Sequence, residues 1–248
     1  MPPKPTAFID ADILLHRAVS FCEGDFDGEK MTDWKQALYF FDHIQKSWLK
    51  AIGPVEDFFL VISVGQNFRK GLYPDYKANR KDITPHPAFA GLKQEVMSMA
   101  GVIWEEGIEA DDLIGIRCTE DQNTIAVSAD KDFATVPCRL FIPASHGRKE
   151  GTWHTFSEDE ANMNWFRQAL TGDVIDNYKG IPGVGPKKAE KIIPGLAPVP
   201  FHWGNLRQAF LDAKMTEADA LTMCRLARIL RAGDYDFETK EVKLWQPT

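Results

Sequence analysis

Short apolar runs that end in acidic residues are the feature that most constrains how this 248-residue chain folds. The run TAFIDA ends in acid, the run TIAVS at 124–128 is followed by acid, and two further acidic groups lie in or near turns. The four groups are Asp10 with Asp12, Glu109 with Asp111 and Asp112, Asp130 with Asp132, and Asp173 with Asp176. In an open α/β sheet, ligands gather at the carboxyl ends of the strands, so this repetition favours one shared site.

The apolar runs alternate with amphipathic stretches that have the spacing of helices. This pattern predicts strands at 6–11, 57–63, 102–104 and 124–128, and helices at 33–53, 88–100 and 111–120. Strands that alternate with helices indicate an α/β fold in which a mainly parallel sheet is covered by helices.

The pattern changes near residue 157, where Ser157 and Glu160 have the spacing of a capping box. Helical spacing then continues to about Gly233, interrupted by the glycine-rich stretch 180–185, and Thr216 is placed to cap the last long helix. The alternating tail DYDFETKEVKLW predicts a closing hairpin. We therefore expect an α/β region at 1–156 and a helical region at 157–248, packed together as one unit.

So many carboxylates at one sheet edge would repel one another and raise one another's pKa values. Divalent cations relieve that repulsion, and ligand sets made only of oxygen favour Mg²⁺ or Mn²⁺. Two such ions about 3.5–4 Å apart can activate a water and stabilise the leaving oxygen in phosphodiester hydrolysis. Any one pair of these acids is more typical of a solvated helix start, so the prediction depends on the repetition.

The stretch GIPGVGPKKAEKII at 180–193 predicts a tight glycine turn followed by a helix that begins near Pro186. Gly183 and Gly185 leave backbone N–H groups exposed, and Lys187 and Lys188 lie beside them. Such a turn binds a phosphate without reading sequence. The alternative is an ordinary glycine-rich turn between helices, but the whole string is more specific than its G-x-G part.

The stretch NFRKGLYPDYKANRK at 67–81, inside a basic loop at 64–87, interleaves cations with aromatic rings. The cations are Arg69, Lys70, Lys77, Arg80 and Lys81, and the rings are Phe68, Tyr73 and Tyr76. Cations contact phosphates and aromatic faces stack on unpaired bases, so the stretch favours a single-strand contact over a solvated surface loop.

Composition narrows the class of protein. No apolar run approaches the roughly 20 residues of a membrane helix, and the N-terminus lacks the layout of a signal peptide, so we expect a cytoplasmic protein with no membrane partner. Four scattered cysteines predict neither a zinc site nor disulfides. The net charge of −7 does not exclude nucleic acid, because it becomes +1 when eight carboxylates proposed as metal ligands are set aside.

Together these motifs resemble the 5′-nuclease superfamily, which includes flap endonucleases and the 5′→3′ exonuclease domains of bacterial DNA polymerases. The matching segments are FIDAD, FRKGLYPDYKANR, IEADDLIG, SADKDF and TGDVIDNYKGIPGVGPKKAEKI, in the family's order from residue 8 to about 193. The short length and the ending ARILRAGDYDFETKEVKLW are most similar to the 5′→3′ exonucleases of T-odd bacteriophages. The resemblance implies a PIN-like fold with a helix–three-turn–helix region.

The resemblance also implies roles for individual residues. The first metal cluster would be Asp10, Glu109, Asp111 and Asp112, and the second Asp130, Asp132, Asp173 and Asp176. Asp12 fits the family pattern less well and is as consistent with a helix cap. Lys77 and Arg80 would grip and polarise the scissile phosphate, and Tyr76 would stack on a base. The glycine turn would hold duplex DNA, with a K⁺ ion on its carbonyls.

One position departs from the family. An acid is usual in the turn after the second strand, but this chain has Val64 there, in ISVGQNFRK. A valine cannot bind a metal ion, so the first cluster is one carboxylate short. Either the enzyme tolerates the loss, or its activity is reduced, or the residue is a deliberate inactivation.

The sequence therefore predicts a 5′→3′ exonuclease and flap endonuclease that uses two Mg²⁺ or Mn²⁺ ions, is phage-encoded, and acts on DNA 5′ ends and on RNA–DNA hybrids in the host cytoplasm. One competing hypothesis is a DNA-binding protein of the same scaffold whose chemistry is weakened by Val64. Another is a PIN-type ribonuclease, which is less favoured because that group lacks the glycine turn. The oligomeric state stays open.

Overall fold

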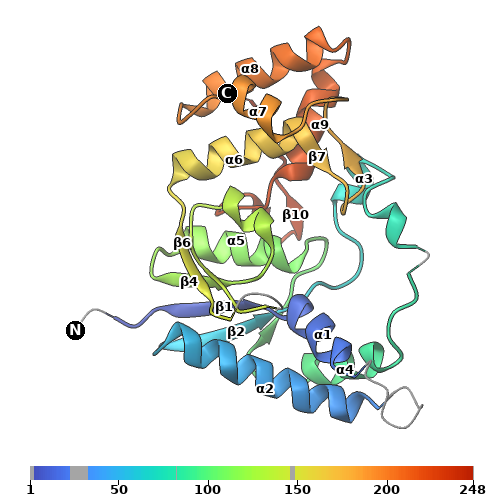
Figure 1. The fold of residues 1–248 in the computed structure, drawn as a ribbon, viewed down its shortest axis with the longest axis vertical. Coiled ribbons are helices and arrows are strands. Elements are labelled where there is room, and N and C mark those ends of the chain that lie inside the picture. The colour runs from blue at the N-terminus through green and yellow to red at the C-terminus, as the bar shows by residue number, and fades with distance from the viewer. Residues whose placement is uncertain (1–2, 23–32, 82, 146–148, 248) are drawn as a thin grey trace.

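The computed structural model describes residues 3–22, 33–81, 83–145 and 149–247. Within these ranges a six-stranded sheet has the order β3-β2-β1-β4-β5-β6 (Figure 1). The strands β1 (Thr6–Asp10), β2 (Asp57–Val61), β3 (Val102–Ile103), β4 (Thr124–Val127) and β5 (Arg139–Ile142) are parallel, and the edge strand β6 (Thr152–Thr155) is antiparallel. The predicted α/β fold with a mainly parallel sheet is confirmed.

Helices cover both faces of this sheet (Figure 1). The helices α1 (Ala11–Ser20), α2 (Trp34–Ile52) and α4 (Ala88–Met97) share one apolar core with one face of β1 and β2, in which Leu14, Phe41 and Leu92 are fully buried. The helix α5 (Ala110–Glu120) packs on the opposite face, where Leu113 and Ile114 are buried. No helix in the described ranges is long and apolar enough to cross a membrane.

A third apolar core holds the helical C-terminal region together. It contains α6 (Glu158–Thr171), α7 (Pro186–Ile192), α8 (Val199–Asp212) and α9 (Glu217–Ala227), with Trp165, Phe210 and Cys224 in its interior. The predicted capping box at Ser157 and the predicted cap at Thr216 both form: these side chains accept hydrogen bonds from the third residue of α6 and α9. A short hairpin of β7 (Gly172–Asp173) and β8 (Tyr178–Lys179), which the sequence did not predict, follows α6.

The last helix ends earlier than predicted, at Ala227 and not near Gly233. The helix ends there because the backbone groups that follow it form hydrogen bonds with buried side chains of the α/β region and not with the helix. The carbonyl of Arg228 accepts from Arg69 Nη2 at 2.6 Å, and the amide of Leu230 donates to Asp112 Oδ1 at 3.0 Å. The predicted closing hairpin is confirmed as β9 (Tyr235–Asp236) paired with β10 (Glu241–Val242).

The described residues of the basic loop 64–87, all except residue 82, lie between β2 and α4, pass the helical region and contain the short helices α3 (Arg69–Leu72) and η1 (Ala78–Arg80) (Figure 1). The amide of Lys77 donates to the carbonyl of Asp176 at 2.8 Å, and Asn79 Nδ2 donates to the carbonyl of Val174 at 3.2 Å. These bonds fix the loop against the β7–β8 turn and bring its cations to the carboxyl ends of the strands.

Candidate functional site

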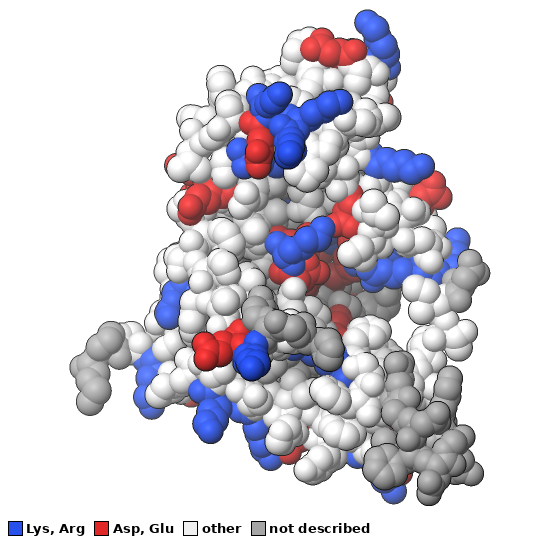
Figure 2. All heavy atoms as spheres, viewed as in Figure 1, with Lys and Arg blue, Asp and Glu red and all other residues white. Residues whose placement is uncertain are grey.

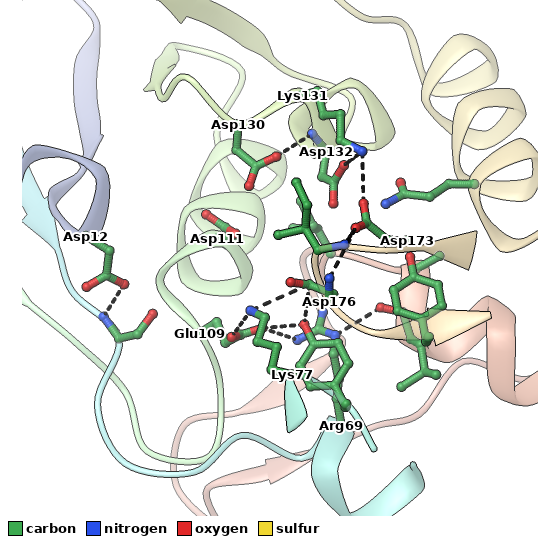
Figure 3. Close-up of a pocket in the computed structure, with 18 of the residues that line it drawn as sticks. Asp12, Arg69, Lys77, Glu109, Asp111, Asp130, Lys131, Asp132, Asp173 and Asp176 are labelled. Atoms are coloured by element: carbon green, nitrogen blue, oxygen red, sulfur yellow. Dashed lines mark hydrogen bonds and ion pairs between the residues drawn. The ribbon is translucent and has the colours of Figure 1, made fainter. Parts of the chain in front are cut away.

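A pocket of about 330 Å³ lies between the carboxyl ends of the strands, the basic loop and the helical region. Figure 2 shows acidic side chains set in a hollow there, and Figure 3 shows those that line it. Seven of the eight predicted metal ligands contribute to the lining: Asp10, Glu109, Asp111, Asp130, Asp132, Asp173 and Asp176. Segments that are up to 166 positions apart in sequence thus meet in one cavity, as the positions of the acidic groups had predicted.

Local backbone structure orients several of these carboxylates. Asp10 ends β1 and caps α1: Ile13 N donates to its Oδ1 at 3.1 Å, and Ser128 Oγ donates to its Oδ2 at 2.8 Å. Asp130 caps η2 (Lys131–Thr135), where Asp132 N donates to its Oδ1 at 2.8 Å. Asp111 lies in the first turn of α5. Asp10 and Asp130 are therefore held where a strand gives way to a helix, and Asp111 lies at the start of a helix.

Burial and neighbouring carboxylates raise the pKa values of four of the carboxylates. Burial, together with the charge of Asp12, raises the pKa of Asp10 to about 7. Burial raises the pKa of Asp111 well above its usual range, and the neighbouring carboxylates add to this. Burial also raises the pKa of Asp130, and that of Asp132 to about 6. A cation placed beside these groups would stabilise their ionised form and lower their pKa values.

The other carboxylates in the pocket already contact cations of the chain. Lys77 Nζ forms an ion pair with Glu109, Arg80 Nη2 lies 2.8 Å from Asp176 Oδ1, and Lys131 Nζ lies 2.9 Å from Asp173 Oδ2. Burial alone would raise the pKa values of Glu109 and Asp173, but these cations and hydrogen bonds hold both below their usual values. Lys131 was not among the predicted site residues, although its place between two ligand aspartates could have indicated it.

Two predicted roles are wrong. Asp112 does not line the pocket; it is fully buried, and its two oxygens lie 2.7 Å from Arg69 Nη1 and Nη2. Arg69 is only 3% exposed and also donates to the carbonyl of Leu226, so its guanidinium cannot contact a DNA phosphate. The pair instead joins α3, α5 and the segment after α9. Lys70, its neighbour, is exposed as a DNA contact requires.

Tyr76 is also placed differently from the prediction. Its ring is buried, with 2% of the residue exposed, so it cannot stack on a base. Its hydroxyl lies 2.9 Å from Glu109 Oε2 and 2.8 Å from Asp176 Oδ2 and can donate to one of them at a time. Burial and these carboxylates raise its pKa above the usual value, which keeps it a donor.

The helix cap that the sequence allowed at Asp12 is formed by Asp10, which also lines the pocket. Asp12 lines the pocket as well, and its Oδ2 accepts from Ser63 N at 3.0 Å. Val64 follows Ser63 but packs against the apolar core under α1 and α2 and does not line the pocket. The end of β2 therefore contributes Ser63 and no carboxylate.

The glycine turn lies outside the pocket, at the start of α7. A Cβ on Gly180 would lie 2.1 Å from the carbonyl oxygen of Leu170, so only glycine fits there. Gly183 has a φ of +74° and Gly185 precedes α7, with Pro186 in the first helical position. Lys187 and Lys188 are exposed, and Figure 2 shows basic side chains grouped in this part of the surface.

The donor set of the pocket fits divalent cations that prefer oxygen ligands, because it consists of carboxylates whose pKa values are raised by burial and by one another. Within the described ranges no three acidic, histidine or cysteine side chains already converge as a finished metal site would. Side-chain rotations about fixed backbone positions would have to complete the coordination.

Comparisons with known proteins agree on one group of enzymes. Residues 5–146 match the family model for the 5′-3′ exonuclease N-terminal, resolvase-like domain. An exonuclease of Escherichia phage T7 is 26% identical over 98% of this chain and 94% of its own length. Flap endonuclease Xni of Aeromonas hydrophila is 27% identical over 71% of this chain and 72% of its own length.

Among solved structures, a flap endonuclease of bacteriophage T5, in a pseudo-enzyme–product complex with DNA and metal ions, is similar to this chain. It has a TM-score of 0.65 and 16% identity, over 90% of this chain and 88% of that one. At this identity the similarity establishes the fold.

Proposed function

The chain belongs to the 5′-3′ exonuclease family that shares this N-terminal, resolvase-like domain, and on that premise we propose that it hydrolyses phosphodiester bonds at the 5′ ends and flaps of DNA, with divalent cations. The observation that carries the proposal is that eight carboxylates line one pocket, together with Lys77, Arg80 and Lys131. The relatives named exonuclease and flap endonuclease support the reaction class, and the phage T5 complex supports DNA and metal ions as partners.

We assign the metal ligands to two groups. Asp10, Glu109 and Asp111 would hold one ion, and Asp130, Asp132, Asp173 and Asp176 the other. Mg²⁺ or Mn²⁺ would supply the charge that polarises the phosphodiester and makes a water acidic enough to attack. Asp112 is left out of the first group because Arg69 occupies both of its oxygens.

The chain's own cations would act on the substrate phosphate. Lys77 and Arg80 come from the basic loop and contact carboxylates at the edge of the pocket. A scissile phosphate placed there offers them a second anionic partner. When negative charge develops on the phosphate oxygens, the ammonium and guanidinium groups stabilise it without large rearrangement.

The surface outside the pocket would hold the duplex. The exposed Lys187 and Lys188 beside Gly183 and Gly185 fit a contact with the DNA backbone, which does not depend on sequence. Lys70 would add a contact on the side of the basic loop. A K⁺ ion at the turn, an RNA–DNA hybrid as a second substrate, and action in the cytoplasm of an infected host are further parts of this proposal.

The test is cleavage of a 5′-labelled duplex, a 5′ flap and a matched RNA by the full chain with Mg²⁺ or Mn²⁺. We expect cleavage of both DNA substrates, abolished by EDTA and by Asp111→Asn. Val64→Asp is the second variant, because it places a carboxylate after β2. If only Val64→Asp cleaves, the chain is the weakened DNA-binding form; cleavage of RNA alone would favour the ribonuclease. If the chain neither binds nor cleaves DNA, the proposal is overturned.

A further inference from the structure

Asp12 is a pocket carboxylate with no role in the assignment above. It lies in the first turn of α1, two residues after Asp10, and lines the same cavity. Figure 3 shows it on the β1–α1 side, across the cavity from the carboxylates of α5 and the β7–β8 turn. Its position thus extends the acidic lining to a side where β2 ends.

The contacts of Asp12 leave its charge uncompensated. Its Oδ2 accepts one hydrogen bond, from Ser63 N at 3.0 Å. In the described part of the chain, no lysine or arginine nitrogen lies within 4 Å of its carboxylate, whereas Glu109 and Asp176 each contact two or more such nitrogens. A half-buried carboxylate held by a single neutral donor is well suited to an added cation.

The end of β2 brings no carboxylate to the pocket, in contrast to the ends of β1 and β4. β1 ends at Asp10, and β4 is followed by Asp130, so both strands deliver an acid to the pocket. β2 is followed by Ser63, which lines the pocket, and by Val64, which packs into the apolar core. The carboxylate of Asp12 lies against the amide of Ser63 and so occupies the space at the end of this strand.

We propose that Asp12 is a metal ligand of the first group, supplying from α1 the carboxylate that the end of β2 lacks. The proposal rests on the proposed function, namely that this pocket binds divalent cations. The competing role is structural: Asp12 would only anchor the loop after β2 through the amide of Ser63.

Asp12→Asn separates these two roles. The asparagine keeps an Oδ1 that accepts from Ser63 N, but it loses the negative charge that a Mg²⁺ or Mn²⁺ ion requires of its ligand. The probe is Mn²⁺ binding to the full chain, measured by titration calorimetry and by the electron paramagnetic resonance of free Mn²⁺. Asp111→Asn serves as the positive control. Glu56→Gln, an exposed acid at the opposite end of β2, serves as the matched negative control.

We expect Asp12→Asn and Asp111→Asn each to raise the Kd for Mn²⁺ at least about 10-fold, and Glu56→Gln to leave it unchanged. The melting temperature in EDTA should not fall, because the hydrogen bond to Ser63 persists. If Asp111→Asn weakens Mn²⁺ binding and Asp12→Asn does not, the role of Asp12 is overturned and the proposed function stands. If neither weakens binding, the metal site itself is misassigned and both proposals fail. A melting temperature lowered in EDTA, with Mn²⁺ affinity unchanged, would establish the anchor role instead.

Discussion

The carboxylates of the pocket form two groups that differ in whether cations of the chain balance their negative charge. The ion-paired group consists of Glu109, Asp173 and Asp176, which contact Lys77, Lys131 and Arg80. The raised-pKa group consists of Asp10, Asp111, Asp130 and Asp132, for which burial outweighs the cations within reach. Asp132 belongs to the second group even though Lys131 Nζ lies 3.8 Å away, because that lysine is largely exposed.

The difference indicates which carboxylates contribute most to the binding free energy of a divalent cation. In the raised-pKa group the cation competes with protons, and in the ion-paired group it competes with side chains of the chain itself. A lysine or arginine displaced from a carboxylate remains at the pocket and can contact a phosphate. We therefore expect the raised-pKa group to dominate the affinity for divalent cations, and the cations paired with the other group to be those that a substrate phosphate can contact.

Arg69→Met should break the structure beneath the ion-paired group and give the largest effect on stability. The substitution leaves Asp112 fully buried without its partner, and breaking a buried pair in this way costs about 3–5 kcal/mol. Urea unfolding measures the loss. Lys70→Met, one position later and exposed, should change the free energy of unfolding by less than about 0.5 kcal/mol. Equal effects of the two variants would contradict the buried role of Arg69.

Asp111→Asn should separate activity from stability within the raised-pKa group. Loss of a metal ligand removes several kcal/mol of transition-state stabilisation, so kcat should fall about 10²- to 10³-fold. Stability at pH 7 in EDTA should be equal or higher, because a carboxylate that resists ionisation has been neutralised. Cleavage rates and urea unfolding measure the two quantities. A variant that loses both together would show that Asp111 is structural.

Much of the fold could be predicted because apolar residues recur along the sequence with the spacing typical of strands and helices. The acids at the ends of β1 and β4 could be placed in one site because parallel strands end at the same sheet edge. The burial of Arg69 and Tyr76 could not be predicted from a stretch that has the composition of a surface loop. It depends on α9, whose Leu226 carbonyl accepts from Arg69 across 157 positions of sequence.

The position of the helix cap, at Asp10 and not at Asp12, has a similar cause. Both residues are consistent with a cap at a strand–helix junction, and only the position where α1 begins decides between them. Because α1 begins at Ala11, Asp10 becomes the cap and Asp12 falls in the first turn, facing the end of β2. One residue of difference in a helix boundary, which sequence patterns do not resolve, thus decides which of two pocket acids caps the helix.

The pH dependence of stability in EDTA should reveal the raised-pKa group. Asp10 keeps its proton to about pH 7 in the folded chain but loses it near 3.8 when unfolded, so the free energy of unfolding should fall as pH rises between these values. The loss should exceed about 1.4 kcal/mol, the equivalent of one pKa unit. When the pH is lowered below about 4, the free energy of unfolding should also decrease, because Glu109 and Asp173 become protonated and lose their ion pairs.

Urea unfolding between pH 4 and 8, with and without Mg²⁺, measures this profile. Mg²⁺ should flatten the fall above pH 4, since it binds the ionised carboxylates of the folded chain. Asp10→Asn should flatten it without Mg²⁺. A stability that rises steadily from pH 4 to 7 in EDTA would contradict the raised pKa values and, with them, the division of the pocket into two groups.

The double variant Lys187→Ala/Lys188→Ala should give the smallest effect, since it lies outside both groups. Two lost phosphate contacts should weaken DNA binding equally for all sequences and reduce the slope of log affinity against log salt by about 2. Lys4→Ala/Lys50→Ala, which removes two exposed lysines elsewhere, changes the net charge equally and should leave the slope unchanged. Fluorescence anisotropy with duplexes of unrelated sequence, in EDTA, measures binding without cleavage. If both double variants reduce the slope alike, DNA senses only the overall charge, and the glycine turn has no specific place in holding the duplex.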